Sequence, residues 1–175
     1  MLGSSHLLVG TTTAAWTAYL LPVPPSIALM VGSVVVVGSM IPDLDHINSR
    51  ASRSIPDAKY ASLLVRQFGG HRTVTHDPRI GPSVFAILTA LAFVLIPGPI
   101  GDHWWAFAVA MWAGCMSHLW ADSRTTNGIP YGDRRIKIGR TFRTGSDRET
   151  WLRQMVYRPV AIVSVVAVVY LITVP

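Results

Sequence analysis

The sequence is short of charge and has almost no cysteine. Of its 175 residues, 14% are charged and 50% are hydrophobic, and the mean hydropathy is +0.40. This composition is too apolar for an ordinary soluble domain and is typical of a chain with transmembrane helices. The single cysteine, Cys115, lies inside an apolar stretch, which excludes both a disulfide framework and a cysteine-based zinc site.

Lysine and arginine are missing from the start of the chain. Residues 1–6 contain neither, and an apolar run follows them directly. A secretory signal peptide needs a positively charged segment ahead of its apolar run. We therefore expect this first segment to be retained.

Long apolar runs are what the sequence has in abundance. Each is near or slightly below the ~20 residues that cross a bilayer as a helix. Small residues such as Gly38 and Gly114 would let such helices pack closely. The sequence therefore predicts an all-α integral membrane helical bundle of about five short spans, forming one domain over residues 1–175. The apolar runs cover residues 7–23, 26–41, 83–100, 104–121 and 159–174.

Positive charge is confined to two of the connections between these runs. Six of the fifteen Lys and Arg residues lie between the second and third runs, and the other nine lie between the fourth and fifth. With five spans, both basic connections fall on one side of the membrane, which the positive-inside rule makes cytoplasmic. We therefore predict a multi-pass protein of the inner (cytoplasmic) membrane with its N-terminus inside and its C-terminus outside.

The sequence pI of about 10.1 has a simpler explanation than nucleic-acid binding. The basic residues flank the predicted spans, and no nucleic-acid recognition module is visible. Attraction to anionic lipid, worth about 1 kcal/mol per basic residue near the surface, accounts for them. The expected partners are the lipid membrane and an anionic small-molecule or lipid substrate, with no nucleic acid; the oligomeric state is left open.

The basic connections carry local patterns of their own. A short helix is predicted over residues 56–68, and a small hairpin over residues 134–142. Ser146 and Glu149 have the spacing of a capping box, which predicts a helix start at this point.

Histidine and aspartate gather in four short clusters at the ends of apolar runs, all on the side that the charge pattern makes cytoplasmic. Imidazole and carboxylate are common ligands of zinc and related divalent metals. His118 and Asp122 are four residues apart, so a helix would present both on one face. The clusters predict one cytoplasmic-facing metal site assembled by folding, with His103 on the opposite side. The predicted ligands are His6, Asp43, Asp45, His46, His71, His76, His118 and Asp122.

Four residues are candidates for catalytic roles at this site. Asp45 or Asp77 could act as general base, since each lies beside predicted ligands. Arg72 and Arg124 are placed to hold an anionic group, because guanidinium pairs with phosphate or carboxylate through two parallel hydrogen bonds. Each cluster taken alone also has a plainer interpretation as a polar helix end or a solvated loop, and His6 is the weakest candidate.

Three motifs in order carry a family resemblance. They are residues 38–46 (GSMIPDLDH), 71–76 (HRTVTH) and 117–128 (SHLWADSRTTNG). Together they resemble the LexA-regulated, inner-membrane family of metal-dependent hydrolases, and the likeness runs from His6 to about Glu149. Zinc-dependent phospholipase C enzymes are similar in motif style, at a greater distance. One departure is Asp77, where the family usually has serine.

The resemblance and the ligand clusters imply the same chemistry. We expect one or more divalent ions, zinc-like in their ligands, to activate water for hydrolysis. The arginines favour an ester or phosphoester of a lipid or lipid-linked substrate. Two rival functions use the same residues: a metal-binding membrane sensor or carrier, and a non-catalytic scaffold in which polar clusters tie helices together. The predicted spans have no charged residue in their middle, which counts against a transport pathway.

Overall fold

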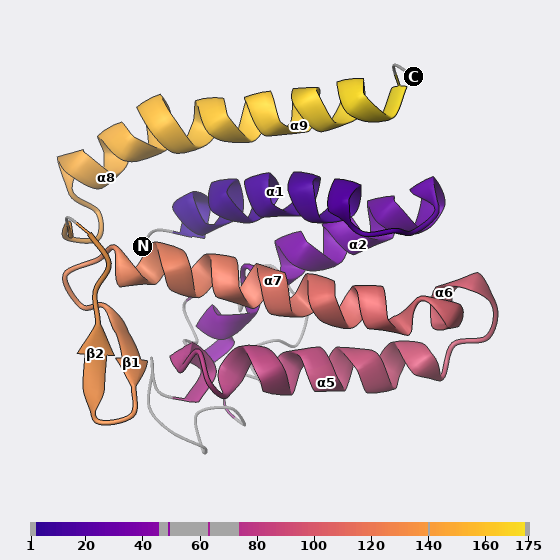
Figure 1. The fold of residues 1–175 in the computed structure, drawn as a ribbon. Coiled ribbons are helices and arrows are strands. Elements are labelled where there is room, and N and C mark those ends of the chain that lie inside the picture. The colour runs from indigo at the N-terminus through magenta and orange to yellow at the C-terminus, as the bar shows by residue number, and fades with distance from the viewer. Residues whose placement is uncertain (1–2, 46–48, 50–62, 64–73, 140, 174–175) are drawn as a thin grey trace.

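The computed structural model describes residues 3–45, 49, 63, 74–139 and 141–173, and it is built mainly of helices (Figure 1). All five predicted apolar runs contain a helix. Four of these helices lie side by side in the order α9, α1, α7, α5, and α2 packs against both α1 and α7. The five helices are α1 (Gly3–Leu20), α2 (Pro25–Gly38), α5 (Gly81–Val94), α7 (Trp104–Ser123) and α9 (Arg158–Thr173).

Proline and short helical turns set where the helices begin and end. Pro25 and Pro82 occupy the first turns of α2 and α5, where a missing N–H costs no hydrogen bond. In the described residues, three short pieces lie between the main helices: η1 (Ile41–Asp45) directly after α2, η2 (Val74–His76) before α5, and α6 (Pro99–Asp102) before α7. The helix predicted over residues 56–68 lies outside the described residues.

Two glycines let α2 and α7 cross in backbone contact. A Cβ on Gly114 would collide with the Val35 carbonyl oxygen, and one on Gly38 would lie 2.9 Å from the Met111 carbonyl oxygen. The prediction that small residues permit close helix packing is thereby confirmed at this crossing. This crossing holds Ser39, the residue after Gly38, against the turn of α7 that carries His118.

The main hydrophobic core fills the space between α1, α2 and α7. It contains small side chains and one stacked aromatic pair, Phe93 with Phe107, whose ring centroids are 4.0 Å apart. A second, smaller cluster of Ala121, Phe142 and Tyr157 lies where α7 meets the chain that leads to α9. The buried members of the main core are Ala14, Ile27, Val31, Val35, Ala106, Phe107 and Ala110.

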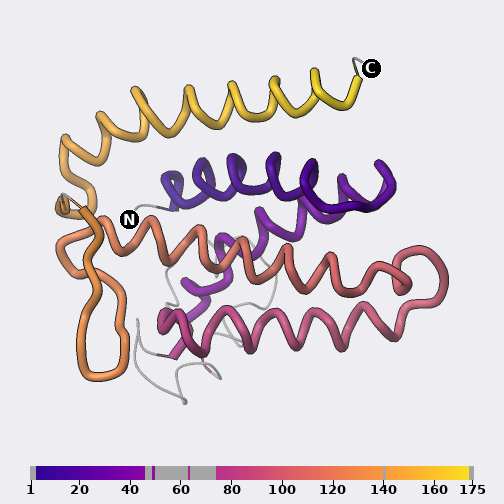
Figure 2. Tube along the Cα trace, in the orientation of Figure 1, coloured from indigo at the N-terminus to yellow at the C-terminus, as the bar shows by residue number. Residues whose placement is uncertain are grey.

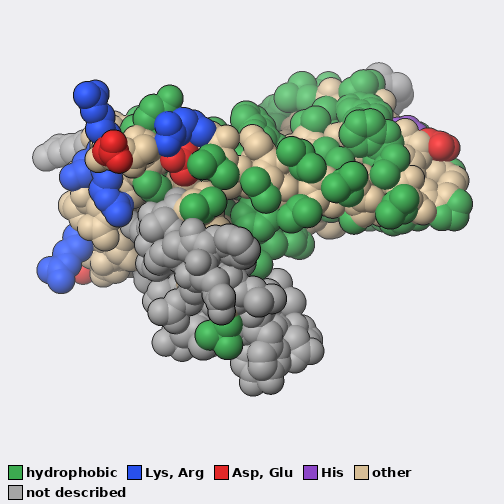
Figure 3. Space-filling view, turned by 90° about the horizontal axis from the view of Figure 1, so that it is seen from below, with side chains coloured by type: hydrophobic (Ala, Val, Ile, Leu, Met, Phe, Trp, Pro, Cys, Tyr) green, Lys and Arg blue, Asp and Glu red, His purple; other side chains and the backbone are tan. Residues whose placement is uncertain are grey.

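The surface is apolar along the bundle and charged at one end. Figure 3 shows hydrophobic side chains over most of the visible face and Lys and Arg at the end that carries the hairpin. Within the described residues, two helical stretches are long and apolar enough to cross a membrane, Pro25–Asp45 and Asp147–Thr173, while Gly81–Val94 is apolar but shorter. Length and composition thus show two candidate spans, and the count of five stays a prediction.

A β-hairpin and a kinked helix follow α7. Strands β1 (Ile129–Tyr131) and β2 (Arg134–Ile136) pair antiparallel around Gly132, whose φ is +60°. The predicted hairpin was right in kind but wrong in position, because the turn comes before Arg134 rather than after it. The chain then runs through α8 (Asp147–Leu152) and a π-helical turn, Arg153–Tyr157, into α9. Ser146 caps α8 by accepting from the Glu149 N–H, as the spacing predicted.

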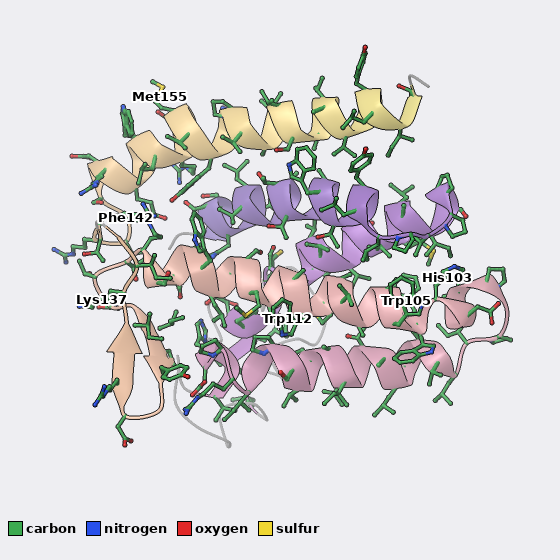
Figure 4. The ribbon with its side chains drawn as sticks, viewed as in Figure 1. His103, Trp105, Trp112, Lys137, Phe142 and Met155 are labelled. Carbon is green, nitrogen blue, oxygen red and sulfur yellow. The ribbon has the colours of Figure 1, made fainter. Side chains whose placement is uncertain are left out.

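Because successive main helices run in opposite directions, segments that are distant in the sequence meet at one end of the bundle. The trace in Figure 2 shows the start of α1, the start of α5, the end of α7 and the hairpin at the same end. η1 contacts both η2 and α7 there. His103 lies at the opposite end, away from Lys137 and Phe142 (Figure 4). The four described histidines are therefore divided between the two ends of the bundle, with His103 apart from the other three; the assignment of these ends to membrane sides stays a prediction.

Candidate metal centre

Four elements place histidine and aspartate side chains around one point. α1 contributes His6, η1 contributes Asp43, η2 contributes His76, and α7 contributes His118 and Asp122 one turn apart. Two overlapping groups of three could each hold a metal ion: His6 with His118 and Asp122, and Asp43 with His76 and His118. His118 belongs to both groups and is the centre of the cluster.

The inward-facing atoms have the spacing of metal ligands. His118 Nε2 lies 3.3 Å from His76 Nε2. Asp43 Oδ1 lies 3.6 Å from each of these nitrogens. Asp122 Oδ2 lies 3.6 Å from His76 Nε2 and 3.8 Å from His118 Nε2. Ligands about 2.0–2.2 Å from a tetrahedral zinc ion lie roughly 3.3–3.6 Å from one another, so the donor set fits a divalent ion.

The outer nitrogens of His76 and His118 are held by acceptors. His118 Nδ1 is 2.8 Å from the Ser39 carbonyl oxygen, which the Gly38–Gly114 crossing brings there. A carbonyl only accepts, so the proton sits on Nδ1 and the neutral ring turns the lone pair of Nε2 inward. Neutral imidazole with its second nitrogen so anchored is the form that binds metals.

Asp45 takes the corresponding place behind His76. Its Oδ2 lies 3.4 Å from His76 Nδ1 and accepts a 2.8 Å hydrogen bond from the Thr75 hydroxyl. Burial favours the neutral ring of His76, but the Asp43 and Asp45 carboxylates, as acceptors for its ring N–H groups, outweigh burial and raise the pKa of His76. The sequence predicted Asp45 as a ligand or general base, whereas the structure gives it the supporting place on the outer nitrogen.

His6 packs flat on His118. The two rings are stacked with centroids 3.8 Å apart and planes 7° from parallel. His6 Nε2 lies 3.3 Å from Asp122 Oδ1, yet neither ring nitrogen makes a hydrogen bond of ordinary geometry within the described part of the chain. A buried imidazole without such bonds is costly, and a cation between these side chains would remove that cost. His6, the weakest candidate from the sequence, thus fits the site well.

Among the described ligand candidates, Asp43 is the one with an exposed side chain. The side chains of His76, His118 and Asp122 are fully buried and that of His6 is 2% exposed, whereas Asp43 is 23% exposed. Water and substrate would therefore reach the inward-facing atoms past Asp43.

Asp77 faces a different partner. Its carboxylate accepts from Arg79 Nε at 3.0 Å and Nη2 at 2.7 Å, and from the Gly132 N–H at 3.3 Å. The Arg79 guanidinium holds the pKa of Asp77 at about 2 and lies 4.5 Å from the centre of the Tyr131 ring. The residue predicted as a general base therefore joins the His76 segment to the β1–β2 hairpin.

Arg124 lies directly after the α7 ligand pair. Its guanidinium carbon is 5.5 Å from the centre of the Trp120 ring, and its buried Nε has no hydrogen-bond partner in the described residues. Three further predicted site residues, His46, His71 and Arg72, lie outside the described residues, so their placement stays a prediction.

Several groups that support the site were not predicted from the sequence. The Ser39 carbonyl is a backbone atom, and the Thr75 hydroxyl lies 3.0 Å from His76 Nδ1 while it donates to Asp45. Glu149, fully buried, accepts from the Ser5 hydroxyl at 2.9 Å and the Gly145 N–H at 2.7 Å, which ties the start of α8 to the residue before His6. Its likeness to the family pattern was the only sequence hint of this role.

Comparison with known proteins agrees with this architecture. A family model described as YdjM inner membrane protein matches residues 1–174. The chain belongs to the YdjM inner membrane protein family. YvsG of Bacillus subtilis (strain 168), described as an uncharacterized protein, is 28% identical over 152 residues, which cover 85% of each chain. No solved structure matches the chain. Membership of the YdjM family confirms the predicted inner-membrane setting.

Proposed function

We propose that this YdjM-family protein is a membrane-embedded, metal-dependent hydrolase. The observation that carries the proposal is the cluster of His76, His118, Asp43 and Asp122 atoms 3.3–3.8 Å apart, with both imidazoles anchored from behind. Nitrogen and oxygen donors in this number suit zinc or a related first-row ion. The proposed ligands are these four residues together with His6.

An ion held here would supply Lewis-acid chemistry and a nucleophile from water at neutral pH. The protein supplies the rest. Asp45 and the Ser39 carbonyl fix the orientation of the two imidazoles, and Asp43 is the most exposed of the described ligand candidates. Asp43 is therefore the carboxylate best placed to accept a proton from water, in preference to Asp45 or Asp77.

The proposed substrate is a phosphoester of a lipid or lipid-linked molecule. Arg124 follows the ligand pair of α7, and Arg72 lies in the His71–His76 motif, so both are candidates for the phosphate oxygens. An apolar bundle with its charged end at the site suits a substrate at head-group depth. The motif similarity to zinc-dependent phospholipase C favours the same bond type.

The proposed topology has five spans, with the site on the cytoplasmic side. Its support is the confinement of Lys and Arg to connections on the site's end of the bundle. A reporter fused after Thr173 should be active outside the cytoplasm, and one fused in the hairpin turn at Asp133 should be active inside. The opposite pattern would reverse the orientation and leave the site's geometry unchanged.

The two rival functions make different demands. A scaffold has no use for a buried His6 ring that lacks ordinary hydrogen bonds, because such a ring destabilises the fold unless something binds it. A sensor or carrier would bind metal but turn over nothing.

Turnover of a generic phosphodiester separates these functions. Protein purified in neutral detergent should hydrolyse bis(p-nitrophenyl) phosphate, lose activity when dialysed against a chelator, and regain it when zinc or manganese is added. Stoichiometric metal without turnover of any phosphoester would favour the sensor. Absence of both metal and turnover would favour the scaffold.

A further inference from the structure

A groove lies beside the metal centre. It has a volume of about 340 Å³ and lies between α1, α7 and the start of α9. Val9 and Thr13 form its α1 wall, Trp120 its α7 wall, and Val160 its α9 wall. Ligand sites in proteins have volumes of about 300–1,000 Å³, so the groove is large enough for part of a ligand.

The walls are more apolar than their sequence suggests. The hydroxyls of Thr12 and Thr13 donate to the carbonyl oxygens of Leu8 and Val9 one turn earlier. Ser117 donates in the same way to the Gly114 carbonyl. With their hydroxyls turned back to the helix, these side chains present methyl and methylene surface. The groove therefore suits hydrocarbon rather than a sugar or a peptide backbone.

One end of the groove carries a positive charge. Trp120, which lines the groove, also stacks with the Arg124 guanidinium, and Arg124 lies one turn beyond it on α7. The buried Nε of Arg124 has no hydrogen-bond acceptor in the part of the chain that the structure describes. A buried guanidinium N–H in this state is suited to an anion.

The groove lies next to the metal centre along both α1 and α7. Val9 and Thr13 follow His6 by three and seven residues, so all three lie on the same side of α1, within about 11 Å along its axis. On α7, Ser117 directly precedes the ligand His118. A molecule with its head at Arg124 would thus have its tail along α1, pointing into the bundle and away from the charged end.

We propose that this groove binds one hydrocarbon chain of an anionic membrane phospholipid whose phosphate lies at Arg124. Binding follows from the groove and the arginine alone. The identification of this lipid as the substrate rests on the proposed function. The choice of a phospholipid over free phosphate follows from the apolar walls, which free phosphate would leave unused.

Photolabelling tests the proposal on the full-length protein in neutral detergent. The probe is phosphatidic acid with a diazirine in one acyl chain, compared with phosphatidylcholine that carries the same diazirine. We expect phosphatidic acid to label about tenfold more strongly, which corresponds to about 1.4 kcal/mol. The labelled peptides should contain residues 9–13 and 117–120. Unlabelled phosphatidic acid should compete, and inorganic phosphate at the same concentration should not.

Two substitutions separate the tail site from the head site. Val160→Phe fills the groove from an α9 position that is 47% exposed, so the fold should tolerate it. It should reduce labelling of the groove about tenfold. Val166→Phe on the same helix, 63% exposed and outside the groove lining, is the matched control and should label like the unsubstituted protein. Arg124→Gln should remove the preference for phosphatidic acid over phosphatidylcholine.

Metal content, measured on the same samples, keeps the two proposals apart. Val160→Phe should retain the metal content of the unsubstituted protein. If no sample holds metal but the labelling pattern appears, the proposed hydrolase fails and the lipid site stands. Equal labelling by both lipids, labels spread outside the groove, or undiminished labelling of Val160→Phe would overturn the lipid site.

Discussion

The two ends of the bundle carry the same pair of side chains in opposite settings. At one end, Asp102 and His103 are neighbours in the sequence, and His103 Nδ1 contacts the Pro99 carbonyl in an exposed turn. At the other end, Asp45 backs His76, and both are buried. The difference shows that a histidine beside an aspartate is not itself a site. Burial and convergence from several elements are what separate the candidate metal centre from a polar turn.

The largest expected effect is loss of metal when the shared ligand is removed. His118→Ala takes away the side chain common to both ligand groups. The loss of affinity should exceed the roughly 10–100-fold that removing a supporting partner costs. Elemental analysis of the purified variant should show no stoichiometric metal. His103→Ala, at the other end, is the matched control and should keep full metal content. Equal loss of metal in both variants would show that the two ends do not differ in metal binding.

Asp45→Asn should give the next largest effect. The amide keeps the size of the side chain but can no longer orient the His76 ring as a charged acceptor. We expect metal affinity to fall by about 10–100-fold with the fold intact. Competition with a chelator of known affinity measures the change. Asp102→Asn should leave the affinity unchanged, and an unaffected Asp45→Asn protein would show that Asp45 does not support His76.

A methyl group at the helix crossing should disturb the fold and the site together. Gly114→Ala would place a Cβ against the Val35 carbonyl and the Gly38 backbone, so α2 must move away from α7. We expect a loss of about 1–3 kcal/mol in stability. Metal binding should weaken because the Ser39 carbonyl moves from His118. Gly32→Ala would meet the Ala18 methyl at 3.7 Å and the Ala14 carbonyl oxygen at 3.8 Å, both ordinary contacts, and should be neutral or slightly stabilising in thermal denaturation.

The smallest expected effect is at the hairpin. Asp77→Asn removes a charge-assisted pair with Arg79, but the Arg79 side chain is 47% exposed and water screens the interaction. We expect a loss of about 1 kcal/mol at most and faster amide exchange in residues 129–136. Asp133→Asn in the hairpin turn should leave exchange unchanged. A loss of metal with unchanged hairpin exchange would instead assign Asp77 to the metal centre.

Much of the fold could be predicted because the signals were local. Apolar runs located all five main helices, and Ser146 with Glu149 located the start of α8. The hairpin was misplaced because residues 134–142 alternate only weakly, and the turn at Gly132 precedes them. Length and hydropathy alone could not decide which helices cross the membrane, since α1 and α7 bury polar side chains of the site.

The sequence predicted a shared site but not which residues face its centre and which support those residues from behind. The clusters and the sidedness of charge predicted a shared site, and the structure brings its described members His6, Asp43, His76, His118 and Asp122 together; that they bind a metal stays a prediction. Sequence could not separate Asp43 from Asp45, because only the path of η1 decides which carboxylate faces inward and which lies behind His76. Asp77 was predicted as a general base because it lies beside predicted ligands in the sequence. Its contact with the Gly132 N–H, which is distant in the chain, could not be read from the sequence.

X-ray absorption spectroscopy of the zinc-loaded protein tests the central claim most directly, because it reports the ligands of the ion itself. The account predicts one tightly bound ion with nitrogen and oxygen neighbours at about 2.0–2.1 Å and outer-shell scattering from at least two imidazole rings. His118→Ala should abolish this signal, and His103→Ala should leave it unchanged. A protein that retains no ion after dialysis, or a spectrum with oxygen neighbours alone, would contradict the account.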